Sequence, residues 1–380
     1  MFTYCINRKF KQNGNEIGSH ARFFKDFLKD KKEFIDMNDS DELDLYDFSN
    51  SVKKSRIKNI VNFCYRIGKK DKLELIIPEK YTPLYYIFDK NNIRLPRSFE
   101  DNDIWFIKSV GSSCGRGIRV RRNIERHMYK KHRKIKDRRM KEFCEEYVIQ
   151  KQILSPLING RIWTLRHNIV VFKENDGTIN LWIHKNGAVK LGIDEYNDHD
   201  TSQTKLLDML LTNSDYKNER QKGGKKIPKE SWAMPFVSYE HYEKLFTKMT
   251  IMYKEIFPKL IEYSKQFDKQ YPNLNASFNE ELDLSGNSCY QLLGVDLIFD
   301  RNDNPYIIEI NDGPQVNYKS GVYHNFLDGE IGGKEWRGEM LNDIIELFIK
   351  APLEKYKYDL PTLQIPGNRS FIKIGTTSDM

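Results

Sequence analysis

The chain has 380 residues, of which 39% are hydrophobic and 13% aromatic. This length and composition predict a folded protein with two or three subdomains and exclude a largely disordered chain. The formal net charge of +8 favours an acidic partner, such as a nucleotide, a nucleic acid, a membrane surface or a carboxylate-rich protein tail, without choosing among them.

Cysteine usage and hydropathy indicate a reducing compartment. The five cysteines are scattered and odd in number, and they include no C-x-x-C pair, which argues against a disulfide framework and a structural zinc. No apolar run approaches the roughly 20 residues that span a bilayer, and the start of the chain lacks the apolar region of a signal peptide. We therefore expect a cytoplasmic protein without a membrane segment.

The first part of the chain, residues 1–75, is polar and mixed in composition. Short helical patterns at residues 21–34 and 52–67 predict a small N-terminal subdomain. Residues 76–88 have the pattern of a strand and turn, and they lead into a linker that ends at Pro96.

A glycine-bearing loop between two strands is the first candidate binding motif. The apolar residues 104–110 predict a buried strand that delivers Lys108 into the loop GSSCGRG, residues 111–117, after which residues 118–120 resume as a strand. Backbone N–H groups of such a loop can surround phosphate oxygens. The loop lacks the GK[ST] ending and the following helix of a P-loop NTPase. Lys108 either contacts phosphate or is an ordinary surface lysine.

Residues 119–143 are dense in arginine and lysine and favour a mobile loop or an exposed helix. This segment is either a solvated face or a clamp for an acidic polymer, which would be a glutamate-rich peptide or a nucleic-acid backbone. Aromatic residues are nearly absent from it, which weakens the case for a site that stacks single-stranded bases.

The middle of the chain predicts an antiparallel sheet with flanking helices. Strand patterns occur at residues 146–153, 161–172, 179–186 and 188–192. Arg161, Arg166 and Lys190 are the cations on these strands. Thr164, Arg166 and Asn168 share one parity, so Arg166 can face a cleft. The alternative for each cation is an ion pair with a neighbouring acid.

The remaining segments outside the next hairpin are predicted to be mainly helical. In chain order the patterns indicate a short helix, a disordered surface loop, a long helix, a final amphipathic helix and a partly ordered tail, at residues 201–213, 217–229, 239–267, 335–350 and 352–380. Pro258 is expected to kink the long helix.

Residues 289–314 have the alternation of a β-hairpin. If the turn lies at Asn302-Asp303, antiparallel pairing places Asp296 opposite Glu309, with Asn311 two residues further on the same face. Two carboxylates and an amide are costly to bury unless a cation neutralises them. Such hard oxygen donors suit Mg²⁺ that holds a nucleotide's phosphates. The alternative is solvated polarity at a sheet edge.

Five segments, in this order and spacing, resemble the tubulin–tyrosine ligase-like family of ATP-grasp ligases. They are WFIKSVGSSCGRGI, EYVIQKQI, NGRIWTLRHNIVV, LLTN and LLGVDLIFDRNDNPYIIEINDGP. The resemblance runs from about Lys69 to the final helix. It implies an α+β, ATP-grasp fold, in which antiparallel sheets with flanking helices form two lobes that grip ATP beside a small N-terminal subdomain.

The resemblance also suggests a division of the chain into four parts. Residues 1–75 would be the N-terminal subdomain, and residues 76–155 a central lobe with the phosphate loop and the basic insertion. Residues 156–352 would form the C-terminal ATP-grasp lobe with the metal-binding hairpin, and residues 353–380 a partly ordered tail.

The activity that the resemblance implies is an ATP- and Mg²⁺-dependent ligation of a free amino acid, with glutamate favoured, to a protein acceptor through an acyl phosphate. The acceptor would be an acidic protein, with a tubulin tail suspected, and nucleic acid is a less favoured partner. A cytoskeleton-associated location in the cytoplasm would follow.

The site residues are carried over from the family's motifs. The nucleotide-binding positions are Lys70, Lys108, Gly111, Gly115, Arg116, Gly117, Gln150, Lys151, Ile153 and Asn213. The basic positions that hold the reacting carboxylate or intermediate are Arg166 and Lys190, and the magnesium ligands are Asp296, Glu309 and Asn311.

The chain departs from the family's pattern at several positions. Ile162 replaces a nucleotide-contacting lysine, Thr164 an aspartate, Leu210 a histidine, Ser109 a proline and Gln152 an aromatic residue. These departures motivate a second hypothesis, a catalytically impaired pseudo-ligase that binds tubulin or nucleic acid. A ligase acting on a small molecule is a third, and the basic insertion makes it less natural.

Overall fold

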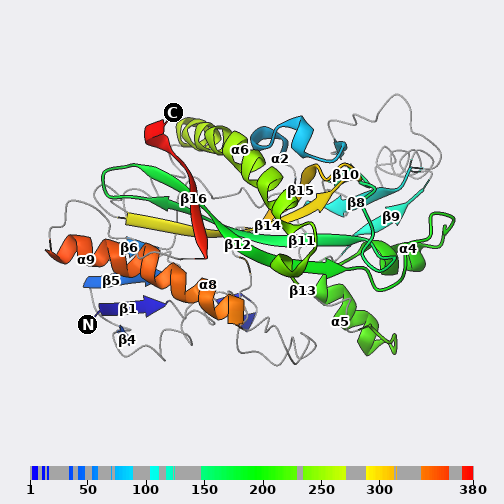
Figure 1. Ribbon diagram of the computed structural model, residues 1–380, viewed down its shortest axis with the longest axis horizontal. Helices are drawn as coiled ribbons and strands as arrows, with labels where there is room; N and C mark the ends of the chain where they lie inside the picture. Colours follow the sequence, from blue (N-terminus) through cyan, green and yellow to red (C-terminus); the bar gives the residue numbers. More distant parts are fainter. Residues whose placement is uncertain are drawn as a thin grey trace.

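The computed structural model combines helices with a largely antiparallel sheet, as the sequence predicts (Figure 1). It describes residues 2–6, 11–12, 15–16, 34–36, 42–47, 54–58, 70, 73–88, 103–110, 117–122, 124, 147–228, 234–270, 288–311, 314, 335–358 and 370–379. No helix among these residues combines the length and the apolar composition that crossing a membrane requires.

Most of the described strands form one large sheet, whose longest strands pair antiparallel. Its main strands are β11 (Trp163–Lys173), β12 (Ile179–Leu191), β14 (Ser288–Phe299) and β15 (Pro305–Asn311). β14 pairs with β11 along one edge and with β15 along the other. β12 pairs with β11, and along its other edge with β13 (Met234–Pro235) and β16 (Phe371–Thr376).

The N-terminal strands extend this sheet in parallel pairing. They are β1 (Phe2–Ile6), β4 (Phe34–Asp36), β5 (Glu42–Asp47) and β6 (Lys54–Lys58), and β6 joins the sheet at the start of β14. The helical pattern predicted over residues 52–67 is therefore wrong at residues 54–58. Backbone pairing with β5 and β14 overrides the weak local periodicity there. The other predicted helix, at residues 21–34, lies outside the described residues except for Phe34, which begins β4.

A second sheet has the order β7-β10-β8-β9. Its strands are β7 (Tyr85–Phe88), β8 (Trp105–Ser109), β9 (Arg119–Arg121) and β10 (Tyr147–Lys151). β8 and β9 pair as the predicted antiparallel hairpin. Before β7 the chain forms the short helices α2 (Leu73–Ile76) and η3 (Glu79–Tyr81) rather than a strand. β2 (Lys11–Gln12) and β3 (Asn15–Glu16) form a separate small pair.

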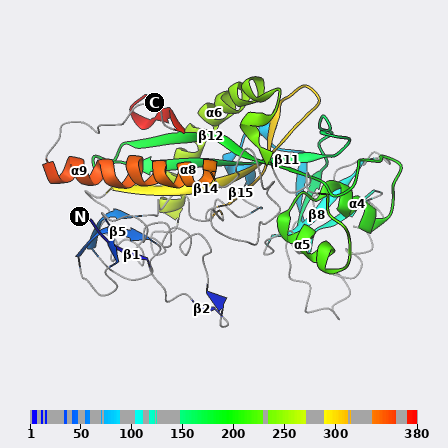
Figure 2. The same ribbon diagram turned by 60° about the horizontal axis from the view of Figure 1, so that its bottom comes forward.

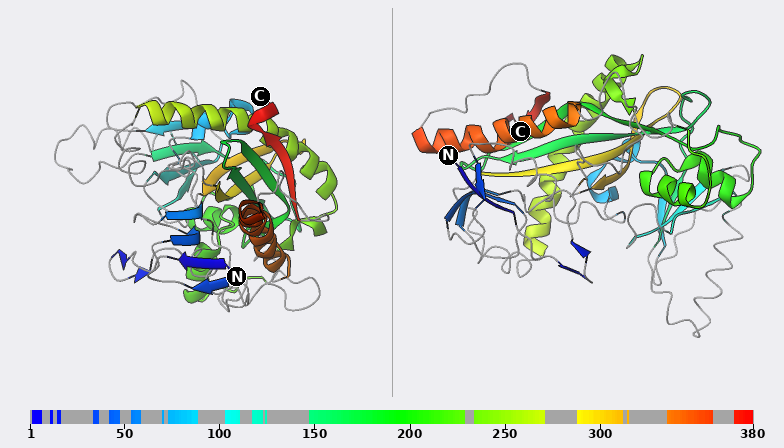
Figure 3. Two further views of the ribbon diagram at one scale, coloured as in Figure 1. Left: turned by 90° about the vertical axis from the view of Figure 1, so that its left-hand side faces the viewer. Right: turned by 90° about the horizontal axis from the view of Figure 1, so that it is seen from below.

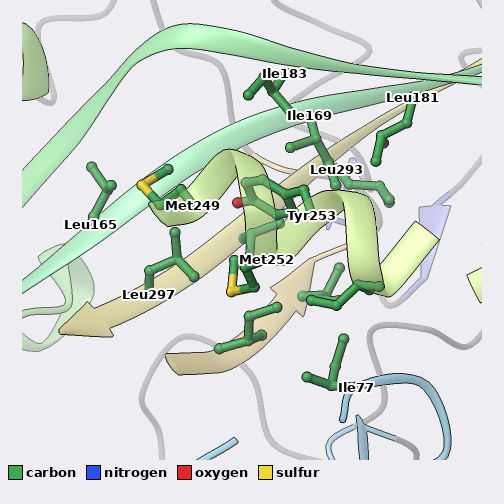
Figure 4. Packing of buried hydrophobic residues seen from close by; sticks show 14 of the residues in the cluster. Ile77, Leu165, Ile169, Leu181, Ile183, Met249, Met252, Tyr253, Leu293 and Leu297 are labelled. Atoms are coloured by element: carbon green, nitrogen blue, oxygen red, sulfur yellow. The ribbon is translucent and has the colours of Figure 1, made fainter. Parts of the chain in front are cut away.

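Helices cover both faces of the large sheet (Figures 2 and 3). α6 (Tyr242–Gln270), which continues through Pro258, covers one face. Its Met249, Met252 and Tyr253 pack in a core cluster with Leu165 and Leu293 of the sheet (Figure 4).

The opposite face is covered by a continuous helical run. It consists of α8 (Glu335–Ile345), the π-helical turn η7 (Glu346–Lys350) and α9 (Ala351–Tyr358). Phe348 of this run packs on Phe172, Trp182 and Tyr290. These residues have the opposite strand parity to Val171, Leu181 and Cys289 in the α6 cluster, as alternation along a strand requires.

One prediction for the later segments needs correction. Residues 217–229, expected to be a disordered loop, begin inside a helix, α5 (Ser214–Lys222), which follows α4 (Gln203–Leu210). The side chain of Asn213 caps α5 by accepting from the N–H groups of Asp215 and Tyr216. This cap, together with burial of Lys217, fixes a helix in a stretch whose composition resembles a loop.

The described part of the tail from residue 352 includes all but the first residue of α9, and all of β16. β16 pairs with β12 from Asn180 to His184 and places the buried Phe371 against Phe348. Two short 3₁₀ turns, η5 (Phe236–Ser238) and η8 (Thr377–Asp379), complete the described elements.

Candidate active site

The first wall of the site comes from the smaller sheet. Phe106 and Lys108 lie two residues apart on β8, so their side chains are on the same face of the sheet. Gln150 lies opposite Phe106 on β10 and accepts a hydrogen bond of 2.5 Å from the Lys108 ammonium. Burial lowers the pKa of Lys108 to about 8, although the carboxylates of Glu309 and Asp296 act to raise it. Lys108 is thus a buried cation close to the two acids of the hairpin.

The second wall comes from the hairpin of β14 and β15. Asp296 lies opposite Glu309, as the alternation predicts, and Asn311 lies opposite Gly294. The register then shifts between Asp296 and Leu297, so a bulge separates this part of the hairpin from its turn. Asp303, at the turn, has a positive φ of 62°.

Each carboxylate of the hairpin has a cationic neighbour. Arg166 lies opposite Asp296 on β11, and its guanidinium donates to both carboxylate oxygens at 2.6 and 2.7 Å. The ammonium of Lys70 lies 3.7 Å from the Glu309 carboxylate. Burial acts to raise the pKa of Asp296, but Arg166 and Lys190 together bring it below its ordinary value. Asp296 therefore remains ionised.

A pocket between the two sheets brings most of the predicted site residues together. Lys108, Gln150, Lys151, Ile153, Lys190, Asn213, Asp296 and Glu309 all line it. Arg166 and Lys70 join it through their ion pairs with the hairpin. Residues that are far apart in the sequence thus converge on one region with both signs of charge.

The other predicted site residues are not in the lining of the pocket, and some of them lie outside the described residues. The Asn311 amide donates to the Gly294 carbonyl at 3.4 Å. Gly117 has a φ of 71° and precedes Ile118, which lines the pocket. Gly111, Gly115 and Arg116 lie outside the described residues.

Two of the pocket residues also have structural partners. Lys151 forms an ion pair of 2.8 Å with Asp103. The side-chain oxygen of Asn213 is used to cap α5. Both residues still line the pocket, but the ion pair of Lys151 and the helix cap of Asn213 are structural roles that do not require a ligand.

Two of the departures that the resemblance indicated, Ile162 and Leu210, lie together in the structure. Ile162 and Leu210 are both buried in one apolar cluster with Leu206 and Met209. Thr164 forms a hydroxyl–hydroxyl hydrogen bond of 2.5 Å with Thr212. Ile162 and Leu210 thus give this part of the pocket an apolar wall.

Sequence reasoning missed several lining residues. Phe106, Ile118, Thr212 and Ile298 line the pocket but were not proposed as site residues. Phe106 could have been found because it lies two residues before Lys108 on the same strand. The same rule could have found Ile298, which lies two residues after Asp296 on β14.

The donor set fits a magnesium ion. Asp296 and Glu309 supply carboxylate oxygens on neighbouring strands, and both carboxylates act to raise the pKa of Lys108. Oxygen donors of this kind are those that Mg²⁺ prefers. A metal at Asp296 would share that carboxylate with Arg166 or replace it.

Fold and site together define a mixed helix and sheet protein with a pocket of cations and carboxylates between two sheets. The model of the tubulin-tyrosine ligase family matches residues 37–330, and the chain belongs to this family.

Relatives within the family carry two kinds of name. A probable tubulin polyglutamylase, ttll-9, of Caenorhabditis elegans is 24% identical over 353 residues, which cover 87% of this chain and 77% of that protein. Tubulin glycylase 3D of Tetrahymena thermophila is 25% identical over 280 residues, covering 72% of this chain and 24% of that protein. Tubulin polyglutamylase ttll-4 of Caenorhabditis briggsae is 23% identical, and the match covers 82% of this chain and 47% of that protein.

Proposed function

We propose that this protein is an ATP- and Mg²⁺-dependent ligase that forms an amide bond between a free amino acid, with glutamate favoured, and a carboxylate of an acidic protein such as a tubulin tail. The observation that carries the proposal is the convergence of Lys108, Asp296 and Glu309 in one pocket between the two sheets. The names of the polyglutamylase relatives support a tubulin acceptor. Association with the cytoskeleton in the cytoplasm follows from the same proposal.

The proposed reaction has two steps. An oxygen of the acceptor carboxylate attacks the γ-phosphorus of ATP, the bond to the β–γ bridging oxygen breaks, and ADP leaves. The amine of the amino acid then attacks the carbonyl carbon of the acyl phosphate. The resulting tetrahedral intermediate collapses to the amide, with loss of inorganic phosphate and a proton. When bound, Mg²⁺ would neutralise charge on the phosphates.

The chain's own residues have distinct roles in this proposal. Lys108 holds a phosphate oxygen, and Asp296 and Glu309, with Asn311 beside them, hold the metal. Arg166 and Lys190 hold the reacting carboxylate. Fixed cations in a buried pocket stabilise developing negative charge more strongly than they would in water.

We further propose that the two sheets are the two lobes of an ATP-grasp fold. The support is the position of the pocket, whose lining comes from β8 and β10 on one side and from β11, β12, β14 and β15 on the other. The end of β10, with Gln150 and Lys151, and the residues that follow it, with Ile153, would be the hinge that meets adenine.

The second candidate is a pseudo-ligase that binds tubulin or nucleic acid without chemistry. The observation that favours it is the apolar packing of Ile162 and Leu210 where the family's pattern has basic residues. The buried Lys108 and the opposed acids of the hairpin favour the ligase instead, since a binding module does not need them.

Incubation with Mg²⁺, ATP, tubulin and labelled glutamate, glycine or tyrosine tests the proposal. We expect ATP-dependent incorporation, highest with glutamate, that Glu309→Gln lowers severely. A matched control is Glu219→Gln on the exposed side of α5. Clear ATP binding without incorporation of any amino acid would favour the pseudo-ligase.

A further inference from the structure

The pocket contains a buried hydrogen-bond donor that the roles above do not use. Gln152 lines the pocket, and the residue is 8% exposed. Its Nε2 atom has no hydrogen-bond partner among the described residues. The backbone of the same residue is satisfied, because its N–H donates to the carbonyl of Ile104 at 2.8 Å. Folded proteins rarely leave a buried amide without a partner, because such a donor is costly.

The surroundings of Gln152 indicate the shape of the missing partner. Apolar side chains from both sides of the pocket line it, namely Phe106, Ile118, Ile162, Leu210, Leu211 and Ile298. Apolar walls that also carry polar groups suit a flat heteroaromatic ring, which buries its faces and makes hydrogen bonds along its edge. Lys108, Asp296 and Glu309 line the same pocket and suit the phosphates and metal of the same ligand.

We propose that Gln152 is a specificity-determining residue that hydrogen-bonds the base of the bound nucleotide and selects adenine over guanine. The inference rests on the proposed function, because it requires a nucleotide in this pocket. It also concerns a residue at which this chain departs from its family's pattern, where an aromatic residue is expected. An aromatic side chain could stack on a base, but it has no amide to hydrogen-bond the edge of the base.

The selectivity follows from the pattern of donors and acceptors. A glutamine amide presents a donor beside an acceptor. Adenine presents the complementary pair, the N7 acceptor beside the N6 amino donor, whereas guanine presents two acceptors, N7 and O6. Adenine can therefore satisfy both ends of the amide, and guanine only one. A site built around a hydrogen bond discriminates strongly against a ligand that leaves it unmade.

Calorimetric titration of the full chain with Mg²⁺-ADP and with Mg²⁺-GDP tests this inference. The variant is Gln152→Met, which has a similar volume and no amide, and the control is Gln221→Met on the exposed face of α5. We expect wild type and the control to prefer ADP by about tenfold or more. Gln152→Met should weaken ADP binding by roughly five- to tenfold and GDP binding by less, because guanine satisfies only one end of the amide.

Thermal unfolding without nucleotide gives a second, independent readout. Gln152→Met should unfold at a temperature equal to or higher than that of wild type, because it removes an unsatisfied buried donor. Equal ADP preference in wild type and Gln152→Met would overturn the inference and leave the proposed ligase intact. Failure of wild type to bind either nucleotide would overturn both. A lower unfolding temperature with unchanged ADP affinity would assign Gln152 a purely structural role.

Discussion

Arg166 and Asp296 lie directly opposite each other on β11 and β14, and the guanidinium donates to both oxygens of the carboxylate. The two side chains are only about one-fifth exposed, at 22% and 20%. The same pair joins the residue proposed to hold a substrate carboxylate to the residue proposed to hold the metal. Its behaviour therefore bears on stability and on ligand binding together.

Removal of the guanidinium by Arg166→Met should lower the free energy of unfolding by about 2–3 kcal/mol, because it leaves a largely buried carboxylate without its closest cation. Mg²⁺ should recover part of this loss, since the ion can neutralise the same carboxylate. Urea unfolding with and without Mg²⁺ measures both effects. Arg301→Met, at the exposed turn of the hairpin, is the control, and an Arg166→Met variant as stable as wild type would contradict the expectation.

Asp208 ties α4 to α5 and so supports the part of the pocket around Thr212 and Asn213. Its buried carboxylate accepts from both Arg220 nitrogens and from the Tyr216 hydroxyl, each at 2.7 Å. Asp208→Asn should cost about 2–4 kcal/mol of unfolding free energy, because the guanidinium loses its charge partner and the amide cannot accept at both atoms.

Urea unfolding measures the cost of Asp208→Asn, and ATP affinity should weaken in parallel because Asn213 begins α5. Glu219→Gln, whose side chain is 72% exposed, should leave both quantities unchanged. Equal losses in the two variants would show that the buried network adds nothing.

Acid should destabilise the fold through two buried histidines on the large sheet. One nitrogen of His167, Nε2, faces the carbonyl of His184, so it carries the proton and Nδ1 accepts from the Tyr253 hydroxyl. Burial lowers the pKa of His167 to about 3 and that of His184 to about 4. The unfolded chain, with a histidine pKa near 6.5, binds more protons than the folded chain across this interval.

The direction of the pH effect on stability follows from this difference in bound protons. The folded protein keeps its full stability above pH 6.5 and loses it as the pH falls from 6.5 toward 4 and 3, at about 1.4 kcal/mol for each unit of pKa difference. Urea unfolding at several pH values gives the free energy of unfolding as a function of pH. Between pH 6.5 and 4, this free energy should fall less steeply for His167→Gln than for wild type. Identical slopes would mean that His167 is not buried in its neutral form.

The hairpin was predictable because its information is local. Alternation and a polar turn determine that Asp296 faces Glu309, and both strands lie within a few residues of that turn. Strand parity also predicts on which face of the sheet the side chains of Lys108 and Gln150 lie. The roles carried over from the family stay predictions, whereas their convergence on one pocket is a property of the fold.

Other features depend on contacts that no local pattern contains. β6 pairs with β14 although more than two hundred residues separate them in the sequence, and β16 returns to β12 in the same way. α5 was missed because its lysine-rich composition resembles a loop, while the cap at Asn213 and the burial of Lys217 arise only in the folded chain. The resemblance led us to expect basic residues at positions 162 and 210, and only the folded chain shows that Ile162 and Leu210 share an apolar cluster.

Calorimetric titration with ATP, with and without Mg²⁺, on wild type and Glu309→Gln tests the central claim most directly. The claim is that Asp296 and Glu309 hold a magnesium ion on ATP opposite Lys108. It predicts that wild type binds ATP about tenfold or more tightly with Mg²⁺ than without, a difference of about 1.4 kcal/mol or more, and that Glu309→Gln loses most of this gain. ATP binding by wild type that is indifferent to Mg²⁺, or absent altogether, would contradict it.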